Sequence, residues 1–366
     1  MRVLFCNRAD ALSRWGGDST QMVETRRALE RLGIDVEVDL SPDPDVRAFD
    51  FVHVFNIQNP ADGLTRIRTA RRAGKPVALS TIYWDVRPLH SMPETAQYHR
   101  SALVRAAARI SPKLALGVLN ARRASRVSRA AREMAELSDV LLPNSVAELE
   151  ILIAQLDYPE ARAKACVVVN GVSMASPQPA PHVERLLREL PAEYVLEVGR
   201  IEPCKGQIRL VRALESAPEL PIVIIGAGSD SSYGRDLDQA ARQRGNTFIV
   251  GPVPHAQLPT FYERARVHAL PSMRESPGLV TMEAAHHGAN CVVGIHAPVQ
   301  EYFGSLAWVC DPTAEDSIRA AVTGAWRAPR DGALGRRVRD TFSWDVAAGQ
   351  TRDAYLRVAA ARSKAA

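Results

Sequence analysis

Residues 196–214, LEVGRIEPCKGQIRLVRAL, contain the transition that decides the fold. The run up to Val198 is apolar and typical of a strand, Gly199 interrupts it, and a helical pattern resumes after Gly206. A strand followed at once by a helix is the unit from which parallel α/β sheets are built. Arg200 and Lys205 lie in the connecting turn, so we expect them at the carboxyl end of the strand, where open α/β sheets bind ligands. Taken alone, the turn is equally compatible with a solvated surface loop.

The same alternation of short apolar runs with amphipathic stretches extends over the whole chain. A first series of predicted strands comprises residues 2–6, 34–40, 49–55, 76–81, 139–143 and 166–170. A second series comprises residues 194–199, 220–226, 246–251, 267–271 and 290–294. The segment GVSMASPQPAPH at 171–182 separates the two series and has the composition of a linker. The pattern predicts an α/β protein of two Rossmann-like domains that face each other across a ligand-binding cleft.

Composition narrows the class of protein further. The chain has 366 residues, a hydrophobic fraction of 46% and a formal net charge of +5, and it contains no apolar run approaching the ~18 residues of a membrane span. Its N-terminal stretch has no apolar core of signal-peptide length, so we expect a cytoplasmic protein. The scattered cysteines form no CxxC pair and predict buried free thiols rather than a metal cluster. These are Cys6, Cys166, Cys204, Cys291 and Cys310.

A second constellation lies in PSMRESPGLVTMEAAHHGAN, residues 271–290. Ser276 suits a helix N-cap and Pro277 the first helical position, which predicts a helix over about 277–287. The helix is apolar nearly all round except at Glu283, and a buried carboxylate requires hydrogen-bond donors. A ribose diol offers two such donors, and an ion pair with an arginine is the alternative. The unpaired amides of Gly278, Leu279 and Val280 predict an anion site at the helix start.

These motifs together resemble family 4 of the retaining glycosyltransferases. Glu275 and Glu283, with seven residues between them, are similar to its E-x7-E signature, and VGRIEPCKG is similar to its G-R-x-x-x-x-K-G loop. IIGAG at 224–228 resembles its G-x-G turn. Weaker similarities are SDVLLPNS at 138–145, NGV at 170–172 and FSW at 342–344.

The resemblance implies the GT-B fold, with an acceptor-side domain over 1–172, a nucleotide-sugar domain over 173–343 and a final helix, about 344–366, that returns to the first domain. It implies that Arg200 and Lys205 bind the donor diphosphate and stabilise the leaving group, that Glu283 binds the ribose, and that Glu275 lies near the transferred sugar. Asp85, in STIYWD at 80–85, is the candidate for the place where many family members have a histidine. The other implied donor-binding residues are Gly16, Gly17, Gly199, Gly226, Gly228, Ser276, Gly278, Leu279 and Val280.

The implied activity is transfer of a sugar from a UDP- or GDP-sugar to an acceptor hydroxyl, with retention of configuration, no cofactor and no metal. The expected setting is bacterial cell-surface glycan or glycolipid synthesis. The alternatives are a nucleotide-sugar epimerase, a sugar-phosphate synthase with a soluble acceptor, or a non-catalytic nucleotide-sugar binding protein. The string DPD at 43–45 matches a metal-binding motif of other glycosyltransferases, but its proline-broken context favours a surface turn.

The stretch 100–132 combines helically spaced cations with apolar residues and has no acidic residue. It predicts peripheral binding to an anionic membrane surface, with a solvated helix face as the alternative. A nucleic-acid partner is disfavoured, because the stretch lacks interleaved aromatic residues for stacking on bases. The cations are Arg100, Arg105, Arg109, Lys113, Arg122, Arg123, Arg126, Arg129 and Arg132.

Overall fold

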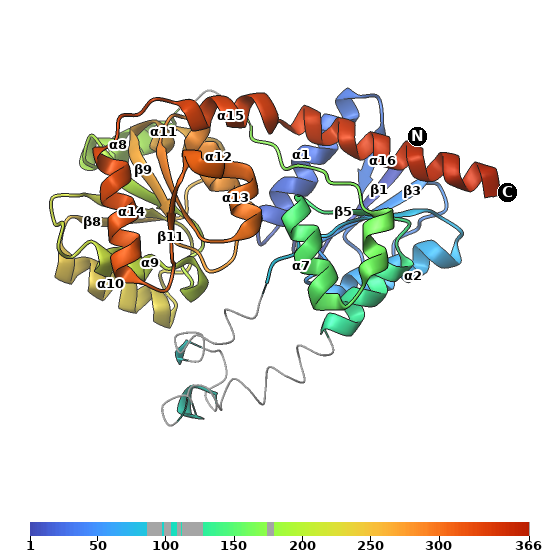
Figure 1. The fold of residues 1–366 in the computed structure, drawn as a ribbon, viewed down its shortest axis with the longest axis horizontal. Coiled ribbons are helices and arrows are strands. Elements are labelled where there is room, and N and C mark those ends of the chain that lie inside the picture. Colours follow the sequence, from blue (N-terminus) through green and yellow to red (C-terminus); the bar gives the residue numbers. More distant parts are fainter. Residues whose placement is uncertain (86–96, 99–103, 108–110, 112–126, 174–178, 366) are drawn as a thin grey trace. The chain divides into compact units, whose positions relative to one another are not determined.

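The computed structural model describes residues 1–85, 97–98, 104–107, 111, 127–173 and 179–365. Contacts divide the chain into two compact units, which are visible in Figure 1. Unit 1 holds the described residues of Met1–Asp85, Leu119–Gly171 and Phe342–Ala366. Unit 2 holds those of Val86–Val118 and Val172–Thr341. Each unit contains one parallel sheet with helices on both faces.

Unit 1 is built on a five-stranded sheet of order β2-β1-β3-β4-β5. Its strands are β1 (Arg2–Cys6), β2 (Asp35–Val38), β3 (Phe51–Phe55), β4 (Val77–Ser80) and β5 (Val140–Leu142). Its helices are α1 (Gly17–Arg31), α2 (Pro60–Arg72), α7 (Val146–Leu156), the 3-10 turn η1 (Pro159–Lys164) and α16 (Trp344–Ala365), with a further helical stretch at 127–137. The central strands β3, β4 and β5 are buried along their whole length, which explains why they are almost entirely apolar, whereas the edge strand β2 carries the exposed Asp35 and Glu37.

One face of this sheet packs against α2, α7 and the stretch 127–137. The C-terminal helix α16 covers the other face and lies beside α1, although more than 300 residues separate them in sequence (Figure 1). Tyr355 of α16 fixes this packing, because its hydroxyl lies 2.6 Å from His53 Nδ1 in the centre of β3. Burial lowers the pKa of His53 to about 3, so this contact is one between neutral groups.

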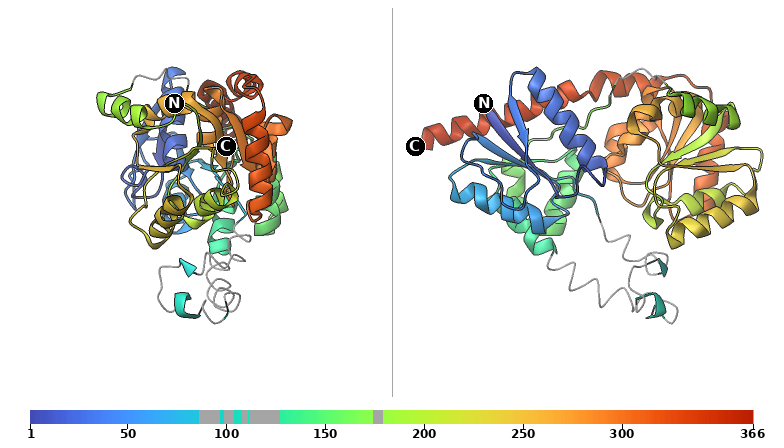
Figure 2. Two further views of the ribbon diagram at one scale, coloured as in Figure 1. Left: turned by 90° about the vertical axis from the view of Figure 1, so that its left-hand side faces the viewer. Right: turned by 180° about the vertical axis from the view of Figure 1, so that it is seen from behind.

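Unit 2 is built on a six-stranded parallel sheet of order β11-β10-β9-β6-β7-β8. Its strands are β6 (Tyr194–Val198), β7 (Ile222–Ile225), β8 (Thr247–Gly251), β9 (Ala265–Leu270), β10 (Asn290–Gly294) and β11 (Trp308–Cys310). Helices α9 (Gln207–Ala213), α10 (Ser232–Arg244) and α14 (Glu315–Arg327) cover one face. Helices α8 (Pro181–Glu189), α11 (Leu258–Arg264) and α12 (Leu279–His286) pack on the other, and Figure 2 shows this layering from behind.

The remaining elements of unit 2 are short. They are η2 (Pro203–Lys205), η3 (His255–Gln257), α13 (Ala297–Phe303), η4 (Gly304–Leu306) and α15 (Ala333–Thr341).

The alternation of strands and helices predicted from the sequence is confirmed, with three corrections. Residues 166–170 form no strand: Ala165 makes an isolated bridge to Leu141, and the amide of Val169 donates to the side chain of Gln350 on α16. The strand β11 was missed in the prediction. The helix predicted from 277 begins at Leu279 instead, because Gly278 has a left-handed φ of 97° that cannot be part of an α-helix.

The five cysteines are free and four of them are buried, as predicted. Of the helices described, none combines the length and apolar character that a bilayer span requires. Residues 174–178 of the predicted linker lie outside the described residues, and its last two residues begin α8.

Candidate functional site

The strand order of unit 2 creates a topological switch point between β6 and β9. The chain proceeds outward from β6 to β7 and β8 on one side, and from β9 to β10 and β11 on the other, so the loops after β6 and β9 diverge and leave space between them. The two loops are joined beneath that space, because the carbonyl oxygen of Cys204 accepts from the amide of Met273 at 2.8 Å and from the hydroxyl of Ser272 at 3.2 Å.

Lys205 and Glu275 form an ion pair across this switch point. Lys205 Nζ lies 2.6 Å from Glu275 Oε1, and the side chains are only 19% and 15% exposed. Burial alone would lower the pKa of Lys205, but the Glu275 carboxylate outweighs it and raises the pKa above its ordinary value. Two residues that are 70 positions apart in sequence, both predicted site residues, are therefore brought into direct contact with the lysine firmly charged.

Arg200 lies in the same loop but is held much less tightly. Its side chain is 55% exposed, and its Nη2 atom is 3.3 Å from Glu202 Oε1. Glu202 is also 3.9 Å from Arg274, so this carboxylate is shared between two arginines. The loop thus presents one fixed cation and one exposed cation on the carboxyl side of β6, an arrangement that can neutralise adjacent phosphate groups.

The predicted glycines shape this loop by letting backbones approach each other. A Cβ atom on Gly226, which follows β7, would lie 1.8 Å from the carbonyl oxygen of Gly199. Any side chain at 226 would therefore push the loop after β7 away from the one that carries Arg200. Gly228 lies in the same close packing, against Ile201.

The start of α12 lies next to the ion pair. A Cβ atom on Gly278 would be 3.5 Å from Glu275 Oε2, which places the N-cap of the helix beside that carboxylate. Leu279 and Val280 occupy the first turn, whose amides have no acceptor within the helix. The amides of Leu279 and Val280 that the predicted anion site requires are therefore at the start of the helix, and anion binding stays a prediction. Ser276 lies three residues before Leu279 and is not the N-cap that the sequence predicts, because Gly278 occupies that position.

Glu283 lies on α12 with only 10% of its side chain exposed. The hydroxyl of Tyr262 donates to Oε2 at 2.8 Å, and Nε2 of His255 lies 2.8 Å from Oε1. The predicted need for hydrogen-bond donors is confirmed, and among the residues that the structure describes these donors are Tyr262 and His255 rather than an arginine. Burial and the neighbouring Glu283 raise the pKa of Tyr262 well above its ordinary value, so the phenol stays a donor.

Three polar residues of this region were missed in the sequence analysis. Tyr262 and His255 stand in a segment without any motif, so only the tertiary contact with Glu283 identifies them. Glu197 did give a signal, since it is the one charged residue within the apolar run of β6. Its carboxyl group is fully buried beneath the Arg200 loop.

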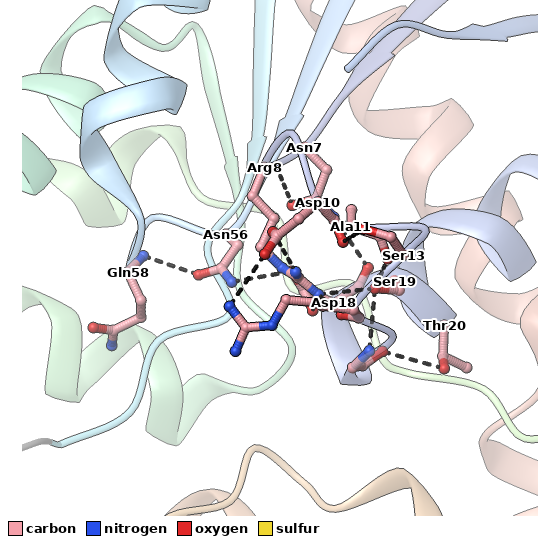
Figure 3. A network of polar contacts seen from close by, with 12 residues as sticks. Asn7, Arg8, Asp10, Ala11, Ser13, Asp18, Ser19, Thr20, Asn56 and Gln58 are labelled. Atoms are coloured by element: carbon pink, nitrogen blue, oxygen red, sulfur yellow. Dashed lines mark hydrogen bonds and ion pairs between the residues drawn. The ribbon is translucent and has the colours of Figure 1, made fainter. Parts of the chain in front are cut away.

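Unit 1 has a switch point of its own between β1 and β3, where polar side chains gather (Figure 3). Arg8, after β1, donates to Asp18 Oδ2 at 2.9 Å and to Asp10 Oδ1 at 2.6 Å. Asn56, after β3, donates to the same Asp18 at 3.3 Å. This network holds the loop that leads into α1, where the predicted residue Gly17 is exposed and a Cβ atom on it would meet nothing within 4 Å. Gly16 is the N-cap of the helix.

Asp85 lies five residues beyond β4, on the carboxyl side of the same sheet, and is half-buried. The neighbouring Trp84 accepts at its carbonyl from Gln58, which connects this segment to the loop after β3. Asp85 is thus on the edge of the sheet that also carries the Arg8 network. Its predicted catalytic role stays a prediction.

Asp43 and Asp45 are exposed, as expected for a surface turn. Arg47 binds Asp45 and lowers the pKa of that carboxyl group to about 2. Of the residues that the structure describes, no three His, Cys, Asp or Glu side chains gather into a group that could hold a metal ion. Most of the basic stretch 100–132 lies outside the described residues; Arg105, Arg129 and Arg132 are the cations within them.

The chain is similar to several known proteins. A model of the family described as Glycosyl transferases group 1 matches residues 182–330. A D-inositol 3-phosphate glycosyltransferase of Xylanimonas cellulosilytica is 31% identical over 77% of this chain and 69% of that protein. Sucrose-phosphate synthase of Thermosynechococcus elongatus has a similar structure, with a TM-score of 0.75 and 16% identity over 99% of this chain and 100% of that one. Anabaena HepE in complex with UDP-glucose gives a TM-score of 0.69 at 15% identity, over 100% of both chains. These likenesses confirm the predicted GT-B fold class.

Proposed function

Because the chain belongs to the group 1 glycosyl transferases, we propose that it transfers a sugar from a nucleoside-diphosphate sugar to an acceptor hydroxyl, with retention of configuration and without a metal ion. The observation that carries the proposal is the Lys205–Glu275 pair at the switch point of unit 2, beside the exposed Arg200 and the first turn of α12. These groups form a cationic, amide-rich site for a diphosphate.

The proposed chemistry of the site depends on where negative charge develops during sugar transfer. Cleavage of the bond between sugar and diphosphate builds negative charge on the departing oxygens. Lys205, already charged and held in place by Glu275, stabilises that charge without a reorganisation of the site. Arg200 adds a planar guanidinium group, which turns from solvent toward the diphosphate and donates hydrogen bonds to it.

Glu283 serves in this proposal as the ribose-binding carboxylate. A carboxylate offers about four lone-pair positions. Tyr262 and His255 occupy two of them, one on each oxygen. The free positions accept the two ribose hydroxyls, so the protein donors orient the carboxylate rather than exclude the ligand. Gly199, Gly226 and Gly228 contribute the close backbone approach that shapes the adjoining loop.

The donor is proposed to be a UDP- or GDP-sugar, and no cofactor is required. HepE, a neighbour in fold, was solved with UDP-glucose, which supports a sugar nucleotide as the class of donor. A thermal-shift screen with UDP, GDP, ADP and their sugars tests this, since a ligand at about 100 times its dissociation constant stabilises the protein by about 2.7 kcal/mol. If none of these ligands shifts the melting temperature, the proposed donor class is wrong.

Retention of configuration and catalytic activity are both tested on the reaction product. With the donor selected in the screen, NMR of the transferred sugar is expected to show the anomeric configuration of the donor. Inversion would contradict the retaining mechanism. Binding of the donor without any transfer or hydrolysis would favour the alternative of a non-catalytic nucleotide-sugar binding protein.

The acceptor is proposed to be a glycan or lipid-linked acceptor of the bacterial cell surface, bound on the unit 1 edge that carries Gly16, Gly17 and Asp85. A soluble phosphorylated acceptor is the second candidate, favoured by the relative that is named a D-inositol 3-phosphate glycosyltransferase. Conversion of inositol phosphate in place of lipid-linked acceptors would decide for this alternative.

A second test separates these two acceptor classes. If the acceptor is lipid-linked, we propose that the protein binds an anionic membrane surface through the basic stretch 100–132. Co-sedimentation with anionic vesicles is expected at low salt and should fall steeply as salt screens the arginines. A fourfold Arg→Glu variant should stay in the supernatant. If the wild type does not pellet at low salt, the stretch is a solvated face and the soluble acceptor is favoured. The four positions are Arg122, Arg123, Arg126 and Arg129.

A further inference from the structure

A carboxyl group lies buried directly beneath the proposed diphosphate site. Glu197 stands in the middle of β6 and is 0% exposed. Side chains alternate along a strand, so Glu197 shares the face of its neighbour Val195, which packs in the apolar core against α9 and α14. Burial of a polar group in such a core is unfavourable unless hydrogen bonds compensate for the lost water.

The hydrogen bonds of Glu197 connect it to the loop of Arg200. Both carboxyl oxygens lie 3.2 Å from Nε2 of Gln207, the first residue of α9. The same Nε2 atom donates to the carbonyl oxygen of Arg200 at 2.9 Å. The side-chain amide of Gln207 thus donates hydrogen bonds both to the carboxyl group of Glu197 and to the loop that carries Arg200. Glu197 and the backbone that carries Arg200 therefore share one hydrogen-bond donor.

Glu197 is also close to Lys205, with Gly199 between them. A Cβ atom on Gly199 would lie 3.1 Å from Glu197 Oε1 and 3.6 Å from Lys205 Cε, so both side chains crowd the space that the glycine leaves open. The lysine is thereby placed between two carboxyl groups, Glu275 in direct contact and Glu197 behind it.

The other titratable groups around Glu197 come from several elements. Lys205 and Glu202 lie on the loop after β6, Glu275 on the loop after β9, and Tyr262 on α11. On β7 the residue opposite Glu197 is the apolar Ile224. His268 of β9 is buried near Lys205, and burial keeps it neutral by lowering its pKa to about 3. The only positive charge that acts on Glu197 among these groups is Lys205.

We propose that Glu197 is a positioning residue for the diphosphate: it is linked to the Arg200 loop through Gln207, in its neutral form it leaves the charge of Lys205 to the ligand, and in its ionised form it competes with the ligand for that charge. This inference rests on the proposed function. Burial raises the pKa of Glu197 to about 8, so the neutral form prevails at pH 7. The site then binds the diphosphate strongly below pH 8 and more weakly above it.

The test is the pH profile of kcat/KM for the donor selected in the thermal-shift screen, between pH 6.5 and 9. For the wild type we expect a decline centred near pH 8, about tenfold between the two plateaus, as a buried negative charge several ångströms from Lys205 implies. Lys205 itself does not titrate in this range, because its pKa lies above its ordinary value. Glu197→Gln keeps the shape and the neutral state, so its profile should be flat.

Glu202→Gln is the matched control. Glu202 belongs to the same loop, and despite its burial Arg200 lowers its pKa, so it is ionised throughout the range tested. Replacement of Glu202 removes one negative charge near Lys205, the same change in charge that ionised Glu197 would undergo on replacement. The decline of kcat/KM near pH 8 should nevertheless stay in place. A decline that persists in Glu197→Gln, or a flat profile in the wild type, overturns the inference.

A measurement on the wild type alone covers the case in which Glu197→Gln fails to fold. An anionic ligand beside Glu197 favours its protonation, so binding of the donor at pH 8 should take up a fraction of a proton. Calorimetry in two buffers of different ionisation enthalpy measures this uptake, and no uptake overturns the inference. Failure of every sugar nucleotide to bind would instead refute the proposed function, which keeps the two failures distinguishable.

Discussion

Replacement of Lys205 by alanine should have two separable effects, one on stability and one on turnover. The substitution leaves the Glu275 carboxylate, 15% exposed, without the cation that lies 2.6 Å away. Loss of one partner of a fully buried pair costs about 3 to 5 kcal/mol, and for a pair that water reaches in part we expect about 2 to 3 kcal/mol. Turnover should fall by about 10² to 10³, the usual effect of removing one preorganised group that stabilises developing charge.

The double variant Lys205→Ala with Glu275→Gln separates these effects. It removes both charges and leaves no unpaired carboxylate, so urea unfolding should show most of the lost stability restored. Turnover at saturating donor should stay low, because no cation faces the diphosphate. Circular dichroism and turnover measured on the same samples give both quantities.

Two outcomes would refute this reasoning. If Lys205→Ala unfolds at the wild-type urea concentration and turns over within about threefold of the wild type, Lys205 has no place in the site. If the double variant recovers wild-type turnover, Lys205 acts only by neutralising Glu275 and does not stabilise the leaving group.

Three further predictions concern the same site. Arg200→Ala should lower turnover by about 10² while stability changes by less than about 0.5 kcal/mol, because its side chain is 55% exposed; wild-type kinetics would remove Arg200 from the site. Glu283→Gln should weaken nucleotide binding at least tenfold in calorimetry, since each charge-assisted hydrogen bond contributes about 1.5 to 3 kcal/mol; unchanged binding by a folded variant would contradict the ribose role. Activity should persist in excess EDTA because lysine, arginine and helix amides stand where a cation would act, and a loss that Mg²⁺ restores would return attention to Asp43 and Asp45.

Much of the fold could be predicted from the sequence because its signals are local. Apolar runs followed by a helical pattern mostly became parallel strands and their helices, as at β6, Gly199 and α9. The family motifs likewise placed Arg200, Lys205 and Glu275 after their strands. The missed strand β11 is a three-residue strand at the edge of its sheet, and only one of its residues is buried.

Where the sequence misled, contacts outside the local apolar pattern were involved. Residues 166–170 have the apolar composition of a strand and lie beside β5, since the amides of Cys166 and Val168 donate to carbonyls of that segment. The amide of Val169 donates instead to Gln350 of α16, about 180 positions further along the chain. Ser276 and Pro277 suit a helix start in isolation. The left-handed Gly278, packed beside Glu275, moves the first turn to Leu279.

The sequence by itself determined which residues stand at the carboxyl ends of the strands, since that follows from local periodicity and turn residues. Only the tertiary structure decided which of them meet. The order of strands places β6 beside β9 and so brings Lys205 to Glu275, and the packing of α11 on α12 brings Tyr262 to Glu283. Burial is likewise a property of the assembled core. It raises the pKa of Glu197, because desolvation depends on every element that covers a group and not on the group's neighbours in sequence.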